Sequence, residues 1–135
     1  MIESMNKQQK ILVISICLIG MLGVAMGAIG KHWAEKVLST TKLKTLSTAT
    51  FYHQLYSIFL FFLIVLKLNF KHSFLRLRTI LYFLIGLIIF SGSLYIYVFS
   101  NIKIFAHITP IGGIMLMVSW ALLSIDLLKH SNRHP

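Results

Sequence analysis

Three side chains capable of ligation or hydrogen bonding lie together near the start of an apolar segment. His53, Tyr56 and Ser57 are spaced i, i+3, i+4, which places them on one face of a helix. An ionisable side chain at membrane depth indicates a functional site. Such a histidine could ligate haem or a metal, or hydrogen-bond a quinone carbonyl. The alternative is a structural hydrogen bond to another helix. The partners available for that bond are Ser91, Ser93, Tyr95 and Thr109.

A second group of residues flanks the apolar segments. His32 and Glu35 are spaced i, i+3, and His107 stands shortly before Thr109. This spacing matches no recognised pattern of metal ligands, so no metal site is predicted. We expect His32, Trp33 and His107 to form a rim that faces solvent and lipid headgroups.

Acidic residues are nearly absent from the chain. Glu3, Glu35 and Asp126 are the complete set, and none is expected at the bilayer midplane. Proton-coupled transporters relay protons through buried acids or histidines, so this scarcity disfavours that class. The sequence also has no nucleophile motif, phosphate-binding loop or HExxH helix. These observations predict a non-enzymatic protein and indicate no particular cofactor.

The composition predicts an integral membrane protein. Of 135 residues, 57% are apolar and 12% charged, and the mean hydropathy is +0.82. A soluble domain of this size could not bury so much apolar surface. The net charge of +10 comes from Lys and Arg beside the apolar segments, with no basic helix of the kind that binds nucleic acid. Cys17 is the single cysteine, so the chain cannot form an intramolecular disulfide.

Four apolar segments predict a single all-α domain over residues 1–135, a four-span transmembrane helix bundle. The segments are 11–29, 48–66, 80–99 and 110–128. The first carries no charge over nineteen residues, about the thickness of a bilayer core.

Local signals refine two of the boundaries. Thr109 is a good N-cap and Pro110 suits the first helical position, so the fourth span is predicted to begin there, with Gly112 and Gly113 in its first turn. Trp33 and Val37 could share one helical face after the first span. We therefore expect a short interfacial helix there, although an irregular loop is the alternative.

The basic residues predict the orientation. The N-terminus, the second loop and the C-terminus carry eight Lys and Arg residues, and the other two loops carry five. The excess places both termini of this multi-pass protein in the cytoplasm.

Four unusual stretches are expected to meet at the opposite end of the bundle. They are "GAIGKHW" (27–33), "FYHQLY" (51–56), "SGSLYIY" (91–97) and "ITPIGG" (108–113). In an up-down-up-down bundle these helix ends share one membrane face. Far-separated parts of the chain would therefore build one cluster.

The same stretches resemble a family of small bacterial inner-membrane proteins, the YgdD/YwdK type, whose common domain is of unknown function; a small mitochondrial transmembrane protein of animals is similar. The family patterns are G-A-F-G-A-H-G, Y-H-x-x-H-A-L, F-S-G-S-L-Y and T-P-I-G-G followed by G-W. The chain departs from them at Lys31, Tyr56 and Ser119, which replace Ala, His and Gly. The resemblance covers residues 27–123 and implies a four-helix membrane protein without an established activity.

Small residues are expected at helix contacts. Gly20, Gly23 and Gly27 are spaced i, i+3, i+7 and include a GxxxG pair, and Gly86 lies in the third span. Small residues let helices approach closely in lipid. We expect packing inside the monomer, with a homodimer face as the alternative.

The leading hypothesis is a non-enzymatic accessory or assembly subunit that docks onto a larger membrane complex. One alternative is a membrane-embedded binding module for haem, quinone or lipid. Another is a small homo-oligomeric channel or carrier. The residues predicted to contact a ligand or partner are His53, Tyr56, Ser57, Ser93, Tyr95, Thr109, Pro110, Gly112 and Gly113.

Overall fold

A computed structural model describes residues 5–69 and 75–131, and these residues are almost entirely helical. The helices are α1 (Lys7–Ile29), the π-helical turn η2 (Gly30–Ala34), α2 (Glu35–Val37), α3 (Thr40–Asn69), α4 (Leu77–Ser100) and α5 (Ile104–Ser131). Four helical stretches in the described part are long and apolar enough to cross a membrane. The predicted all-α architecture with four spans is confirmed.

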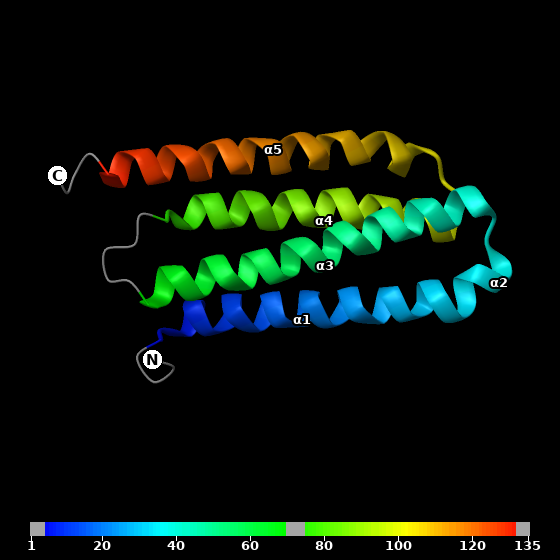
Figure 1. Cartoon of the computed structure of the whole chain (residues 1–135), viewed down its shortest axis with the longest axis horizontal. Coiled ribbons are helices and arrows are strands. Elements are labelled where there is room, and N and C mark those ends of the chain that lie inside the picture. The colour runs from blue at the N-terminus through cyan, green and yellow to red at the C-terminus, as the bar shows by residue number, and fades with distance from the viewer. Residues whose placement is uncertain (1–4, 70–74, 132–135) are drawn as a thin grey trace.

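The long helices lie side by side in the order α1, α3, α4, α5 (Figure 1). Each packs mainly on its neighbours in this order, which leaves α1 and α5 at the two outer edges. The start of α1 and the end of α5 lie at the left end of Figure 1. The connections from α1 to α3 and from α4 to α5 lie at the right end, and the four unusual sequence stretches lie between that end and the middle of the bundle.

The first span is extended by a short helix. Asn6 caps α1, and its side chain and that of Gln9 exchange hydrogen bonds of 2.9 Å with each other's backbone N–H groups. At the other end, η2 joins α1 directly to α2, and extended backbone at Leu38 ends the helix. In place of the predicted separate interfacial helix, the first span continues through η2 and α2 as far as Val37. Residues 40–47 belong to α3 instead.

The predicted start of the fourth span is wrong. The helix α5 begins at Ile104, so Pro110 is inside it, and Gly112 and Gly113 lie beyond the first turn. Left-handed backbone at Asn101 (φ 62°) ends α4, and α5 starts three residues later. The missing N–H of Pro110 costs one bond to the Ala106 carbonyl, a loss the surrounding helix accommodates.

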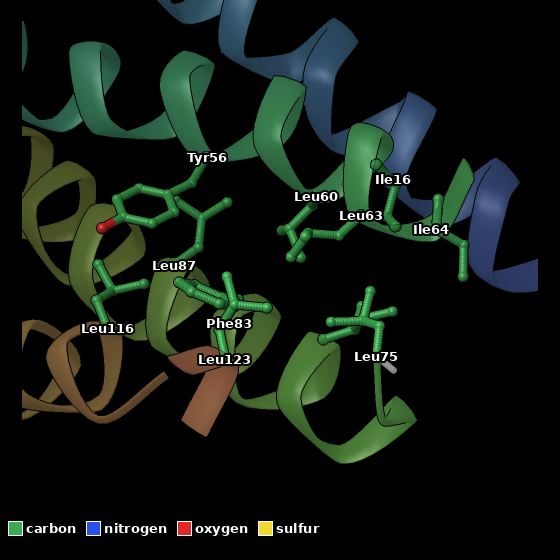
Figure 2. Close-up of a cluster of buried hydrophobic side chains, with 11 residues drawn as sticks. Ile16, Tyr56, Leu60, Leu63, Ile64, Leu75, Phe83, Leu87, Leu116 and Leu123 are labelled. Carbon is green, nitrogen blue, oxygen red and sulfur yellow. The ribbon is translucent and has the colours of Figure 1, made fainter. Parts of the chain in front are cut away.

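A continuous apolar core joins all four long helices. Figure 2 shows its labelled side chains converging between the ribbons. Ile16 comes from α1, Leu60 from α3, Phe83 from α4 and Leu116 from α5. The first three are at most 1% exposed. Burial of these side chains fixes which face of each helix points inward.

The helices α4 and α5 approach each other closely at Gly112. A Cβ atom added at Gly112 would lie 2.7 Å from the Phe90 Cα and would also meet the Phe90 backbone nitrogen. A neighbouring backbone cannot yield as a flexible side chain can, so this contact requires glycine. At Gly86 an added Cβ would lie 3.0 Å from the Leu116 side chain. Both glycines therefore belong to the α4–α5 interface.

Candidate functional site

The predicted histidine bonds to a neighbouring helix. His53 is buried on α3, and its Nδ1 lies 3.0 Å from the hydroxyl of Tyr95 on α4. The Ser57 hydroxyl donates to the His53 carbonyl at 2.6 Å, within the same helix. The interhelical bond expected as one alternative for His53 is thus present. The histidine Nδ1 and Tyr95 together hold α3 and α4 at a fixed spacing.

A hollow of about 170 Å³ lies beside this pair. Ile19 and Leu22 of α1 line one side, and His53 of α3 contributes its imidazole. The residues of α4 that line it are Leu87, Ile88, Ser91, Gly92 and Tyr95. Leu22 and Ile88 are each 54% exposed, so the hollow opens on the surface that faces lipid.

The surface of the hollow is almost entirely apolar, and we call the end at which its hydrogen-bonding residues stand the polar end. Leu87 and Ile88 precede Ser91 and Tyr95 along α4 by three to eight residues. Hydrogen-bonding groups therefore gather toward the end of α4 at Ser100, while aliphatic side chains continue toward its middle. This polarity suits a molecule with one polar group and an apolar remainder.

Ser91 is the unusual residue of this hollow. Its side chain is 2% exposed, and its Oγ finds no hydrogen-bond partner among the described residues. An unpaired buried hydroxyl costs about 1–3 kcal/mol. Next to it, a Cβ added at Gly92 would meet nothing within 4 Å. The Ser91 hydroxyl is itself covered, but its residue lines the hollow, so a rotation of this side chain would present an unpaired donor to a bound molecule.

Three other predicted contact residues, Tyr56, Ser93 and Thr109, form hydrogen bonds away from the hollow. The Trp120 indole N–H donates to the Tyr56 hydroxyl at 3.1 Å, which links α5 to α3. The hydroxyls of Ser93 and Thr109 are 2.8 Å apart and link α4 to α5. Tyr56 and His53, although three residues apart, thus have different partners.

The remaining predicted contacts also lie along α5. Thr109 donates to the Phe105 carbonyl at 3.2 Å and does not cap a helix. Pro110 is exposed, Gly112 is buried and Gly113 is half-buried against Phe90. This part of the motif joins α5 to α4 and does not line the hollow.

The predicted rim residues are exposed. His32 and His107 face outward, and Trp33 lies with its ring centroid 6.2 Å from that of Phe99. Within residues 5–69 and 75–131, no group of three His, Cys, Asp or Glu side chains could hold a metal ion.

The glycines of α1 bring it close to α3. A Cβ added at Gly23 would lie 3.4 Å from the His53 ring, and one added at Gly27 would lie 3.0 Å from the Gln54 amide nitrogen. The Gln54 amide donates to the Gly23 carbonyl at 3.1 Å. Gly20 is looser, with its added Cβ 3.8 Å from Ser57. Gly23 therefore sets how near the wall of the hollow formed by α1 lies to His53.

A second polar cluster was not expected from the sequence. Asp126 is 2% exposed, and its Oδ2 accepts hydrogen bonds from the Thr79 hydroxyl at 2.7 Å and the Arg76 N–H at 3.3 Å. The Arg76 Nε lies 3.4 Å from Oδ1. This carboxylate binds the N-terminal end of α4, where a negative charge is favourable. The sequence feature that could have predicted this cluster is the position of Asp126, an acid within the apolar segment 110–128.

Comparisons with known proteins identify relatives over most of the chain. Residues 26–113 match the family described as "Protein of unknown function (DUF423)". A UPF0382 membrane protein of Staphylococcus saprophyticus is 33% identical over 89% of this chain and 98% of its own length. YwdK of Bacillus subtilis, another UPF0382 membrane protein, is 32% identical over 90% and 98%. The UPF0382 inner membrane protein YgdD of Escherichia coli is 25% identical over 89% and 91%. No solved structure matches the chain.

Proposed function

The chain belongs to the DUF423 family of membrane proteins, and we propose that it binds a small lipophilic molecule in the hollow between α1, α3 and α4. The observation that carries this proposal is the buried Ser91 hydroxyl, which has no partner among the described residues, in a residue that lines the hollow next to the open space at Gly92. A ligand oxygen or nitrogen placed there would remove the cost of the unpaired hydroxyl. The free energy recovered would contribute to binding.

The surroundings of Ser91 support the same function. The lining is almost entirely aliphatic apart from His53, Ser91 and Tyr95, and no charged side chain lines it. Small-molecule sites combine an apolar wall with a few placed polar groups in this way. The opening beside Leu22 and Ile88 gives a lipid-dissolved molecule lateral access.

The size of the hollow distinguishes among haem, quinone and lipid as possible ligands. A cavity of about 170 Å³ is close to the ~150 Å³ that accepts a benzene ring. A porphyrin contains four pyrrole rings and exceeds it, so haem fits this hollow poorly. Quinone and lipid therefore fit better than haem.

The proposed location follows the relatives and the charge distribution. The E. coli relative is named an inner membrane protein. We place this chain in the same kind of membrane, with both termini in the cytoplasm because the basic residues divide eight to five. The polar end of the hollow then lies in the half of the bilayer away from the cytoplasm.

An accessory role remains a second candidate because of α1. This edge helix fully buries only two of its residues, Ile16 and Gly23, and leaves large apolar side chains such as Met21 and Val24 exposed. A channel receives less support. A layer of side chains at most 2% exposed fills the interior below the hollow and offers no polar group to an ion. These side chains are Leu60, Leu63, Ile64, Ile80 and Phe83.

Native mass spectrometry of the full chain, extracted from its own membranes in a gentle detergent, tests the proposal. Gly92→Leu would fill the hollow from its open side, and Gly92→Ala would leave most of it free. We expect a small-molecule adduct on the wild type and on Gly92→Ala, and its loss from Gly92→Leu. An equal adduct on Gly92→Leu, or none on any variant, would contradict the proposal. A second polypeptide that stays bound to all three would favour the accessory role.

A further inference from the structure

Resting on the proposed function, we propose that the hollow takes an uncharged lipophile whose hydrogen-bond acceptor is carried on a six-membered ring, as in a quinone. The juxtaposition that points to it is the unpaired Ser91 hydroxyl, the free space at Gly92 and the aliphatic wall at Leu87 and Ile88. Three features lead to this class of molecule. They are the depth of Ser91, the charge of the lining and the size of the space.

The depth of Ser91 disfavours a phospholipid. The 24 residues of α4 span about 36 Å, and a bilayer core is about 30 Å thick. Ser91 is nine residues before Ser100, so in a centred helix it lies about 5 Å from the midplane. The ester groups of a phospholipid begin at the edge of the core, about 15 Å from the midplane. A phospholipid would have to draw its charged headgroup about 10 Å into hydrocarbon to reach Ser91.

The charge of the lining disfavours an ionised ligand. No Lys, Arg, Asp or Glu lines the hollow, and the Nδ1 of its histidine is bonded to Tyr95. A carboxylate or amine would enter without a partner of opposite charge, which is costly in a low-dielectric site. An uncharged carbonyl, by contrast, needs one donor, and the unpaired Ser91 hydroxyl would supply it once its side chain rotates toward the hollow.

The size and shape of the space favour a ring. About 170 Å³ accommodates one substituted six-membered ring. The absent side chain at Gly92 leaves room for the flat face of such a ring against α4. An apolar tail would leave between Leu22 and Ile88, which are both exposed to lipid. Among membrane-soluble molecules, a quinone combines a ring, a carbonyl and an apolar tail without any charge.

Matched probes test this assignment on the full chain purified in detergent. The first is a decyl-substituted benzoquinone, the second is decylbenzene, which lacks both carbonyls, and the third is phosphatidylglycerol. Binding is measured by native mass spectrometry over a titration of each probe. We expect saturable binding of the quinone and about tenfold weaker binding of decylbenzene, because one buried hydrogen bond is lost.

Two variants and a control locate the bound probe. Ser91→Ala should weaken quinone binding about tenfold and leave decylbenzene binding unchanged. Gly92→Leu should abolish both. Ser124→Ala, an exposed serine bonded within α5, should change neither.

The outcomes separate this inference from the proposed function. A phospholipid or fatty acid that occupies the hollow in a Gly92-dependent way, and that the quinone does not displace, would overturn the ring assignment and leave the proposed function standing. Quinone binding that is equal in wild type and Ser91→Ala would also overturn the ring assignment, since the carbonyl would then not contact Ser91. Binding of every probe that is unchanged in Gly92→Leu would overturn both.

Discussion

Replacing Ser91 by alanine should stabilise the ligand-free protein. The Ser91 hydroxyl is buried without a hydrogen-bond partner in the described residues, so its removal eliminates a desolvation cost and breaks no bond. Ser93, two residues further along α4, is equally buried at 4% exposure. Its hydroxyl bonds to the Phe90 carbonyl at 3.0 Å and to Thr109 at 2.8 Å. Ser93→Ala is therefore a matched control with the opposite expectation.

The two magnitudes follow from these contacts. An unpaired buried hydroxyl costs about 1–3 kcal/mol, so Ser91→Ala should raise the free energy of unfolding by about 1 kcal/mol, the lower limit, because the hollow is partly open. Interhelical hydrogen bonds in membranes contribute about 0.6 kcal/mol on average and at most ~1.7. Ser93→Ala should lower the free energy of unfolding by about 1 kcal/mol. The variants should thus differ by about 2 kcal/mol.

The assay is reversible unfolding in mixed micelles with increasing SDS, followed by far-UV circular dichroism, on protein stripped of bound small molecules. A Ser91→Ala variant that loses as much stability as Ser93→Ala would refute the reasoning. Ser91 would then have a partner, for example a carbonyl of its own helix, and the hollow would lack an unpaired donor. A stabilised Ser91→Ala that also binds less ligand would show that the hydroxyl is kept for binding at the expense of stability.

Three further changes test the contacts between helices in the same unfolding assay. Gly112→Ala should destabilise the protein by about 1–3 kcal/mol, because the added Cβ would overpack against the Phe90 backbone. Gly92→Ala should be neutral or slightly stabilising, because its Cβ would meet nothing. Equal effects of the two substitutions would contradict the close approach at Gly112. Asp126→Asn should cost about 1–2 kcal/mol because charge-assisted bonds at the start of α4 are lost, and no change would mean that the carboxylate is not paired. Tyr56→Phe should lower the free energy of unfolding by about 0.5–1 kcal/mol, and should lower it no further in a protein that already carries Trp120→Phe. Additive losses in this double-mutant cycle would exclude a hydrogen bond between the two side chains.

The four spans could be predicted from the sequence because the bilayer imposes a length. A charge-free segment such as 11–29 has no other stable solvent than lipid, and its helical form follows because lipid cannot satisfy free backbone groups. Topology then brings distant stretches to one end. The contacts between His53 and Tyr95, and between Ser93 and Thr109, occur at that end.

The start of α5 could not be read from local signals. The pair Thr109 and Pro110 has the composition of a helix start, but the same two residues are tolerated inside a helix. The turn at Asn101 determines that Thr109 and Pro110 lie inside a helix. Its left-handed backbone ends α4 early enough for α5 to begin at Ile104. Asn adopts this conformation more readily than most residues, yet the sequence alone does not show that it does so here.

The distinction between Ser91 and Ser93 could not be predicted either. Both stand in "SGS" within an apolar segment, and either could have been the residue without a partner. Their environments depend on how α4 is rotated, because Ser93 faces α5 and Ser91 faces the space beside α1. The rotation is fixed by core residues such as Phe83 and Leu87, which lie one to three turns away. The packing of the helices likewise determines that residue Gly112, which contacts the Phe90 backbone, must be small, whereas residue Gly92, which borders open space, need not be.

The hollow lies between a closely packed pair of helices, α4 and α5, and the edge helix α1, which leaves space toward α4. At one end α5 is held to α4 by the Ser93–Thr109 bond and the contact at Gly112, and at the other by Asp126. On the opposite edge, α1 contacts α3 through Gly23 and the Gln54 bond and leaves space toward α4. A molecule in that space would therefore contact α1 on one side and the firmly joined α3 and α4 on the other. Because α1 is an edge helix that packs mainly on α3, whereas α4 packs on both α3 and α5, we expect α1 to move when the hollow fills. A larger side chain at Gly23, which would meet His53 and Gln54, should widen the hollow.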